Sequence, residues 1–259
     1  MTIIPGATNP TFVLTTDQFG QRLFCKVTAQ NDFGIASQNS NIVGPVTNPA
    51  PAATTWNPAD KTTDLILSGS NLVATNNGSG GFTFQAARGT ISHNTGKKYF
   101  ETTLTNIGNP LVPDCNVYVG LGDTTFAIGS TIPGNGNGKG FTIRSASTNF
   151  IADAETAGWY PSPDPYPPAN GVVVGLAVDL DARKAFFAFN GVFVPATLHG
   201  GNDPVTGAGG LAWGSTAEAA LFPFVGLQWG ATVDAVMTAN FGSIPFVTAP
   251  LPTGYVAWG

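Results

Sequence analysis

Residues 171–191 read GVVVGLAVDLDARKAFFAFNG and contain the pattern that decides the expected fold. Two apolar runs, Val172–Leu180 and Ala185–Phe189, are separated by a short polar turn, and Asn190-Gly191 follows the second run. Asn-Gly is the strongest two-residue hairpin signal, because both residues tolerate the positive φ angles of that turn. Aromatic residues occupy both faces of the second run, so we expect a strand that is buried on both sides.

The same strand-and-turn pattern recurs on both sides of this stretch. Short runs separated by Gly, Asn, Pro and Asp favour strands, and helical periodicity is hard to find. The clearest further runs are Leu23–Ala29, Tyr99–Thr105, Val117–Leu121 and Ala235–Phe241. Residues of Leu23–Ala29 alternate in character, which predicts one covered face, as in a sandwich. The sequence therefore predicts an all-β, antiparallel sandwich.

Composition and charge exclude several classes of partner. Only 10% of the 259 residues are charged, with 10 basic and 15 acidic residues, and Gly and Pro supply 33 and 20 positions. No run of Lys or Arg exceeds two residues, whereas nucleic acids and anionic membrane surfaces require clustered positive charge. No apolar stretch approaches the roughly 20 residues that span a bilayer. We therefore expect neither nucleic acid nor a membrane as partner.

A change of composition predicts a domain boundary at residues 46–55, which read VTNPAPAATT. Closely spaced prolines favour a stiff, extended connector. We therefore divide the chain into residues 1–47, a linker at 48–55 and a larger domain at 56–259. The N-terminal stretch MTIIPGATNP has no basic region and no apolar core, which argues against a secretory signal.

The N-terminal piece resembles the C-terminal half of bacterial and phage immunoglobulin-like repeats. The resemblance rests on a Gly-Ala-Thr turn at residues 6–8 and on Ala29, Asn31 and Gly34, which match a characteristic Ala-x-Asn-x-x-Gly turn. The family's corner tyrosine is replaced by Leu23. A full immunoglobulin-like sandwich needs about 100 residues, so two hypotheses follow. Either the sequence begins inside a longer polypeptide, or another chain supplies the remaining strands.

The larger domain resembles the SPRY (B30.2-like) family. The motifs fall in family order, namely WNPADKT at 56–62, HNTGKKYFETTL at 93–104, VYVGLGD at 117–123, the stretch at 171–191, LFPFVGLQWG at 221–230 and TANFGSIPF at 238–246. The resemblance implies an antiparallel β-sandwich of concanavalin-like jelly-roll topology. It also implies a non-catalytic domain whose loops on one face hold a partner.

The most distinctive loop is rich in proline and aromatic residues and covers residues 154–170, AETAGWYPSPDPYPPAN. Trp159, Tyr160, Asp164 and Tyr166 are the candidate ligand-binding residues, because prolines pre-order the backbone and aromatic rings supply contact area. One interpretation is a platform for a sugar ring or a protein. The other is that Trp159 and Tyr160 fold back over an open end of the sandwich.

The sequence offers little chemistry for a metal or for catalysis. Cys25, His93, Cys115 and His199 are scattered singly, whereas a zinc site shows paired ligands. A calcium site from loop carboxylates at Asp153, Glu155 and Asp164 is the alternative to ordinary solvated acids. Neither histidine has a recognisable nucleophile motif beside it. We therefore predict no metal, no cofactor and no enzymatic activity, with both cysteines as small buried residues.

Together these features predict a non-catalytic virion surface protein of a tailed phage, either a head decoration or fibre, or a tail receptor-binding component. Its N-terminal region would contact other virion proteins within an oligomeric assembly, and its loops would bind a host-surface glycan or protein. The alternatives are a bacterial cell-surface or secreted adhesion module and a carbohydrate-active enzyme on a lectin-like sandwich. We expect assembly in the host cytoplasm and a final location in the virion, or at the cell surface for the second interpretation.

Overall fold

The chain forms two units, residues Met1–Pro51 and Ala52–Gly259, which are described separately. The structure is a computed structural model, and it describes residues 22–40, 42, 53–77, 83–106, 116–129, 140–146, 149–154, 160–161, 169–194, 202–213, 220–229 and 235–259. Within these ranges every regular element is a β-strand, and there is no helix that could span a membrane.

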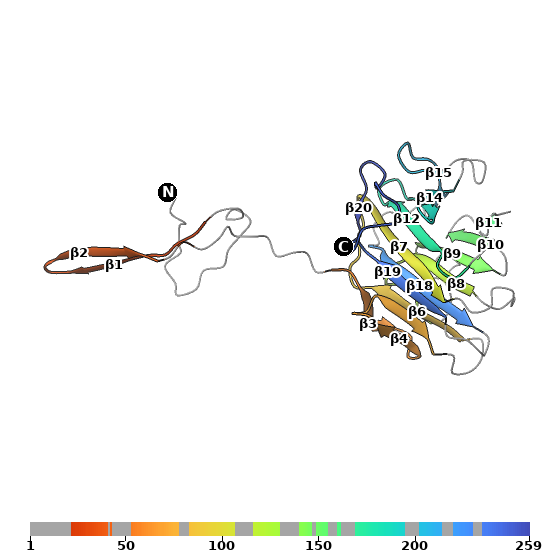
Figure 1. Ribbon diagram of the computed structural model, residues 1–259, viewed down its shortest axis with the longest axis horizontal. Coiled ribbons are helices and arrows are strands. Elements are labelled where there is room, and N and C mark those ends of the chain that lie inside the picture. Colours follow the sequence, from red (N-terminus) through yellow and green to blue (C-terminus); the bar gives the residue numbers. More distant parts are fainter. Residues whose placement is uncertain are drawn as a thin grey trace. The chain divides into compact units, whose positions relative to one another are not determined.

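The described part of the first unit is a β-hairpin of β1 (Lys26–Asn31) and β2 (Gly34–Asn39) (Figure 1). Asn31 lies opposite Gly34, and its Oδ1 accepts a hydrogen bond from the backbone N–H of Phe33, 2.9 Å away, in the turn. Every residue of both strands is exposed. The expected covered face is therefore wrong for this hairpin, and Cys25 is exposed rather than buried, because no described element packs against it.

In the second unit, seven strands form one sheet in the order β11-β10-β9-β8-β18-β6-β3. Their bounds are β3 Trp56–Lys61, β6 Thr83–Gly89, β8 Asn116–Gly122, β9 Gly140–Ala146, β10 Asn149–Ala154, β11 Tyr160–Pro161 and β18 Phe222–Trp229. The order of the strands in this sheet differs from their order along the chain. Sequence-distant strands such as β8 and β18 therefore lie side by side in the middle of the sheet, with Val119 opposite Val225.

The facing sheet follows the order β14-β13-β12-β7-β19-β5-β4. Its strands are β4 Leu65–Ser68, β5 Val73–Asn76, β7 Lys97–Asn106, β12 Val173–Asp179, β13 Lys184–Phe189, β14 Val192–Phe193 and β19 Val236–Asn240. Two short strands add to it, β17 (Leu211–Ala212) beside β13 and β20 (Val256–Ala257) beside β7. The described strand pairs are antiparallel except that of β20 with β7, and β15 (Asn202–Asp203) and β16 (Ala208–Gly209) form a separate small hairpin.

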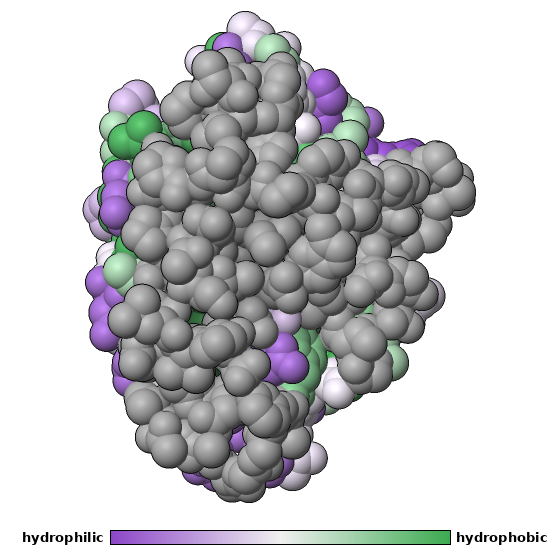
Figure 2. All heavy atoms as spheres, turned by 90° about the vertical axis from the view of Figure 1, so that its right-hand side faces the viewer, coloured by the Kyte–Doolittle hydropathy of each residue, from purple (hydrophilic) through white to green (hydrophobic). Residues whose placement is uncertain are grey.

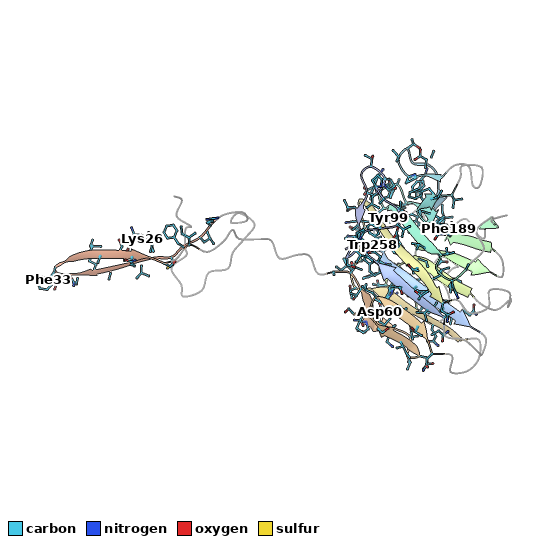
Figure 3. All side chains as sticks on the ribbon, viewed as in Figure 1. Lys26, Phe33, Asp60, Tyr99, Phe189 and Trp258 are labelled. Carbon is cyan, nitrogen blue, oxygen red and sulfur yellow. The ribbon has the colours of Figure 1, made fainter. Side chains whose placement is uncertain are left out.

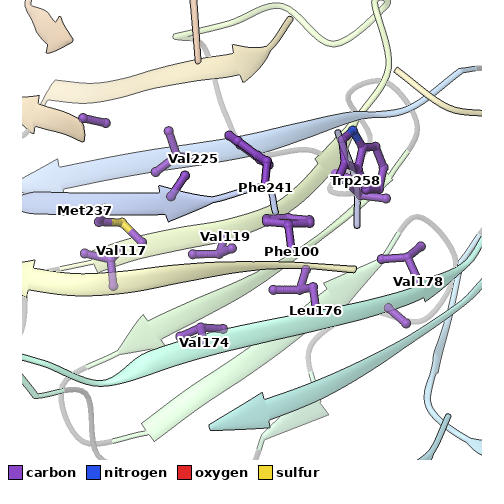
Figure 4. Packing of buried hydrophobic residues seen from close by; sticks show 14 of the residues in the cluster. Phe100, Val117, Val119, Val174, Leu176, Val178, Val225, Met237, Phe241 and Trp258 are labelled. Carbon is purple, nitrogen blue, oxygen red and sulfur yellow. The ribbon is translucent and has the colours of Figure 1, made fainter. Parts of the chain in front are cut away.

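The main hydrophobic core fills the space between the two sheets (Figure 4). Val119 and Val225 enter it from one sheet, and Phe100 and Leu176 enter it from the other. Trp258, almost at the C-terminus, is 1% exposed and packs edge-on against Phe100 with ring centroids 5.6 Å apart. The prediction of an all-β antiparallel sandwich is therefore confirmed.

The stretch at 171–191 forms its two strands as predicted. β12 and β13 pair antiparallel, with Val174 opposite Phe189 at one end and Asp179 opposite Lys184 at the other. Phe189 faces the main core, and Phe186 packs on the opposite side of the sheet. Asn190 and Gly191 have φ values of 49° and 83°, so the two-residue hairpin to β14 has the predicted backbone.

Candidate functional site

The predicted proline-rich, aromatic segment contributes a sheet edge. Tyr160 and Pro161 form β11, the outermost described strand of the seven-stranded sheet, and Tyr160 pairs with Ala152 of β10. Proline suits an edge strand because it has no N–H to offer a further strand. Trp159, Asp164 and Tyr166 lie outside the described residues, so both interpretations of this segment stay open.

The outer face of the same sheet carries an aromatic cluster that the sequence did not reveal. Phe84, Tyr118 and Phe224 come from three adjacent strands, β6, β8 and β18, and Phe126 joins them from the loop after β8. Phe84 lies edge-on to Tyr118 with ring centroids 5.3 Å apart, and Phe126 lies edge-on to Phe224, also at 5.3 Å. Phe84 is half-buried, so solvent reaches part of its ring. Tyr118, Phe126 and Phe224 are buried.

A glycine and an amide shape this cluster. A Cβ atom at Gly226 would lie 2.6 Å from the ring of Phe84, so only glycine lets that ring lie across β18. Beside it the Tyr118 hydroxyl donates to Oε1 of Gln228, 3.0 Å away, and Gln228 is itself half-buried. The face therefore combines an accessible aromatic ring with a polar amide, the combination found in small ligand sites.

One buried polar group lies on this face toward the edge strand. By register Thr142 of β9 lies opposite Gly120 of β8, and its buried Oγ1 has no hydrogen-bond partner among the described residues. β9, β10 and β11 follow β8 in the sheet, so β8 and β11 are three strand spacings, or about 14 Å, apart. The Tyr118–Gln228 pair and the Tyr160–Pro161 edge therefore belong to one continuous sheet, and we take this region as the candidate recognition site.

One buried arginine fastens the loop that borders the site. Arg88 binds both carboxylate oxygens of Asp60, with Nε–Oδ2 and Nη2–Oδ1 distances of 2.7 and 2.9 Å. Its Nη1 donates to the carbonyl oxygens of Asp123 and Phe126, each 2.7 Å away. The Asp123 carboxylate accepts from the backbone N–H of Thr125 and Phe126. The segment that follows β8 is thereby held in one conformation, with Phe126 against the sheet.

The outer face of the opposite sheet is covered by the C-terminal segment. Glu101 is buried, and its Oε1 accepts from the Thr248 N–H at 2.8 Å and from the Tyr99 hydroxyl at 2.9 Å, while Oε2 accepts from the Val247 N–H at 2.9 Å. Burial, with a smaller contribution from the charge of Glu101, raises the pKa of Tyr99, so this phenol stays protonated and donates. Tyr99 and Trp258 are labelled in Figure 3. Glu101 therefore holds the segment in place.

His93 and the Lys97–Asp179 pair are also held by the fold. Nε2 of His93 lies 2.7 Å from the Trp258 carbonyl oxygen, and burial lowers the pKa of His93. Lys97 pairs with Asp179 at 3.4 Å and lies over the ring of Tyr255 at 5.5 Å from its centroid. Among the described residues no three His, Cys, Asp or Glu side chains gather where they could hold a metal ion.

The candidate metal ligands can be placed only in part. The backbone of Asp153 forms part of β10, whereas Glu155, Asp164, Cys115 and His199 fall outside the described residues.

Figure 2 shows hydrophobic and hydrophilic described residues side by side along the margin of the face it presents.

Comparisons with known proteins give structural similarities alone. No protein-family model matches the sequence, and no curated protein matches it. The chain is similar in structure to the SPRY domain of human HERC1, with 11% identity and a TM-score of 0.48 over 73% of this chain and 99% of that one. It is also similar to stonustoxin, with 15% identity and a TM-score of 0.46 over 73% of this chain and 27% of that one.

Proposed function

We propose that this chain is a non-catalytic virion surface protein of a tailed phage that binds a host-surface glycan or protein through its SPRY-like sandwich. Support for recognition comes from the outer face of the seven-stranded sheet, where Phe84 and Gln228 are both half-exposed beside the Tyr118 hydroxyl. Aromatic rings with a few fixed polar groups are the usual composition of small binding sites. The virion assignment rests on the immunoglobulin-like and SPRY-like motifs, together with the low charge and high Gly content of the chain.

The state of the titratable side chains supports binding over catalysis. A general base needs a free lone pair within reach of its substrate. Glu101 and Asp60 instead accept hydrogen bonds from the C-terminal segment and from Arg88, and His93 contacts the Trp258 carbonyl. These contacts give each of the three side chains a role in holding the fold.

Ligand binding is tested with a glycan array and with Trp159→Ala and Gln228→Ala, compared with Val205→Ala as a matched control. Val205 is 55% exposed and lies in the small hairpin between β15 and β16, outside the candidate site. We expect binding lost in the first two variants and retained in the control. Binding that survives both substitutions would remove the site, and turnover of a bound glycan would favour the carbohydrate-active enzyme.

The virion assignment is tested separately. Particles labelled with an antibody to this chain are viewed by negative-stain electron microscopy, and we expect the label on the head or tail surface. Unlabelled particles, with label instead on the surface of bacterial cells, would favour the adhesion module.

A further inference from the structure

The β1–β2 hairpin has an edge that is suited to a second copy of itself. All twelve residues of the two strands are exposed, and Phe33 at the turn is 99% exposed. A two-stranded hairpin is only marginally stable in water unless further strands or another layer join it. Among the described residues β1 and β2 pair only with each other. The hairpin is therefore a surface that a partner would stabilise.

The hydrogen-bond pattern shows which groups of β1 face outward. The Ser40 N–H donates to the Cys25 carbonyl at 2.7 Å, so Cys25 and Ser40 form a hydrogen-bonded pair. Such pairs alternate along an antiparallel ladder, so the backbone groups of residues 27, 29 and 31 also point toward β2. The backbone N–H and C=O of Lys26, Thr28 and Gln30 therefore point away from β2, toward the open edge.

Two opposite charges lie at the two ends of this edge. Lys26 begins β1, and Asp32 follows its last residue, so the charges are six residues apart. Figure 3 shows Lys26 toward one end of the hairpin and Phe33 at the other. Neither Lys26 nor Asp32 has an ion-pair partner among the described residues. A lone lysine at a sheet edge discourages pairing with other strands, unless the incoming strand brings an acid to the same place.

We propose that β1 pairs antiparallel with β1 of a second copy, about a two-fold axis at Ala29, to form a four-stranded sheet. In this register Lys26 lies opposite Asp32 of the other copy, twice, and Thr28 lies opposite Gln30. The outward-pointing groups of residues 28 and 30 then meet each other, as an antiparallel ladder requires. Shifting either copy by one residue places Lys26 opposite a neutral residue, so the charges select this register.

A single strand pair buries less than the roughly 1,200 Å² of a standard interface, so we expect weak association that strengthens when many copies are displayed together.

This inference names one partner of the N-terminal region and does not depend on the virion assignment, because it is tested on the purified full chain. The first test is a disulfide. Residues opposite each other in a non-hydrogen-bonded pair have Cα atoms about 4.5 Å apart, within the range of a disulfide. In a Cys25→Ser, Cys115→Ser background, Ala29→Cys should cross-link into dimers on mild oxidation, on the order of tenfold faster than the matched control Ala36→Cys. Equal rates would overturn the proposal.

The second test is charge reversal, followed by sedimentation velocity over a range of protein concentrations. Lys26→Glu turns two attractive pairs into two repulsive ones, and we expect a dissociation constant about tenfold higher. Asp32→Lys should raise the dissociation constant by a similar factor. The double variant K26E/D32K should restore the dissociation constant of the wild type. Unchanged association in the single variants, or no restoration in the double variant, would overturn the proposed register.

Discussion

The contact between Glu101 and the C-terminal segment provides the sharpest test of how the sandwich is held together. Oε1 of Glu101 accepts from two buried donors, the Thr248 N–H and the Tyr99 hydroxyl, and Oε2 accepts from the Val247 N–H. Val247 is 54% exposed, so water can replace the carboxylate at its N–H if the side chain is removed. The Tyr99 hydroxyl also lies 2.6 Å from Thr248 Oγ1 and can donate there instead, so the cost of Glu101→Ala comes mainly from the buried Thr248 N–H.

An unsatisfied buried donor costs about 1–3 kcal/mol, and the lost bonds are to a charged group, so Glu101→Ala should lower the free energy of unfolding by about 3 kcal/mol. For a domain of about 200 residues this corresponds to a fall in Tm of about 6–12 °C. Urea unfolding followed by tryptophan fluorescence and calorimetry would measure both quantities. Trp258, which packs in the core near this network, provides a fluorescence signal.

Glu101→Gln is the matched control. Its amide oxygen can take the place of Oε1 and keep both buried donors satisfied, while its NH₂ group faces only the half-exposed Val247 N–H. Because a neutral acceptor is weaker than a carboxylate, we expect a cost of about 1–2 kcal/mol. The reasoning is wrong if Glu101→Ala costs less than about 1 kcal/mol, or if both variants lose the same stability.

Three further predictions concern the hairpin turn, the C-terminal tryptophan and the half-buried His93. Gly191→Ala should cost about 2 kcal/mol, because a Cβ would lie 2.9 Å from the Val247 carbonyl oxygen at a φ of 83°. The control Gly171→Ala has a similar φ of 84° but open space, so an equal urea midpoint for both variants would rule out the clash. Trp258→Ala should cost about 3–5 kcal/mol through the cavity that it leaves, and a calorimetric loss below about 1 kcal/mol would contradict the core assignment. The pKa of His93 is lowered by burial, so the unfolded chain takes up a proton before the folded one and stability falls as the pH drops below about 6.5. Urea titrations at pH 7.5 and 5.5 should show a larger loss for the wild type than for His93→Gln, and equal losses would count against this origin.

The candidate site was predictable only where a local pattern reports on it. The proline-rich segment was identified because Pro161 and its neighbours are unusual in composition, but the two described residues in its middle, Tyr160 and Pro161, form an edge strand where a loop was expected, and its binding role stays a prediction. The aromatic face was missed, since Phe84, Tyr118 and Gln228 are far apart in the chain and come together only through the strand order. One local signal existed, namely the glycines that alternate with Tyr118 in VYVGLG.

For the N-terminal hairpin, the sequence predicted a feature that the structure does not show. The alternation in Leu23–Ala29 correctly predicted a strand, although β1 begins at Lys26. The same alternation predicted a covered face, yet every residue of β1 is exposed. Alternation reports which side chains share a face, and it does not report whether anything packs against that face.

The sequence by itself determined the all-β class, the strands of residues 171–191 and the Asn190-Gly191 turn. These depend on the two-residue period of strands and on backbone preferences at single positions, which are local properties of the chain. Only the tertiary structure decided that Arg88 fastens the loop at Asp123 and that Glu101 holds the segment at Thr248. Those contacts join residues 35 and 147 positions apart, and they exist only once the strand order has brought them together.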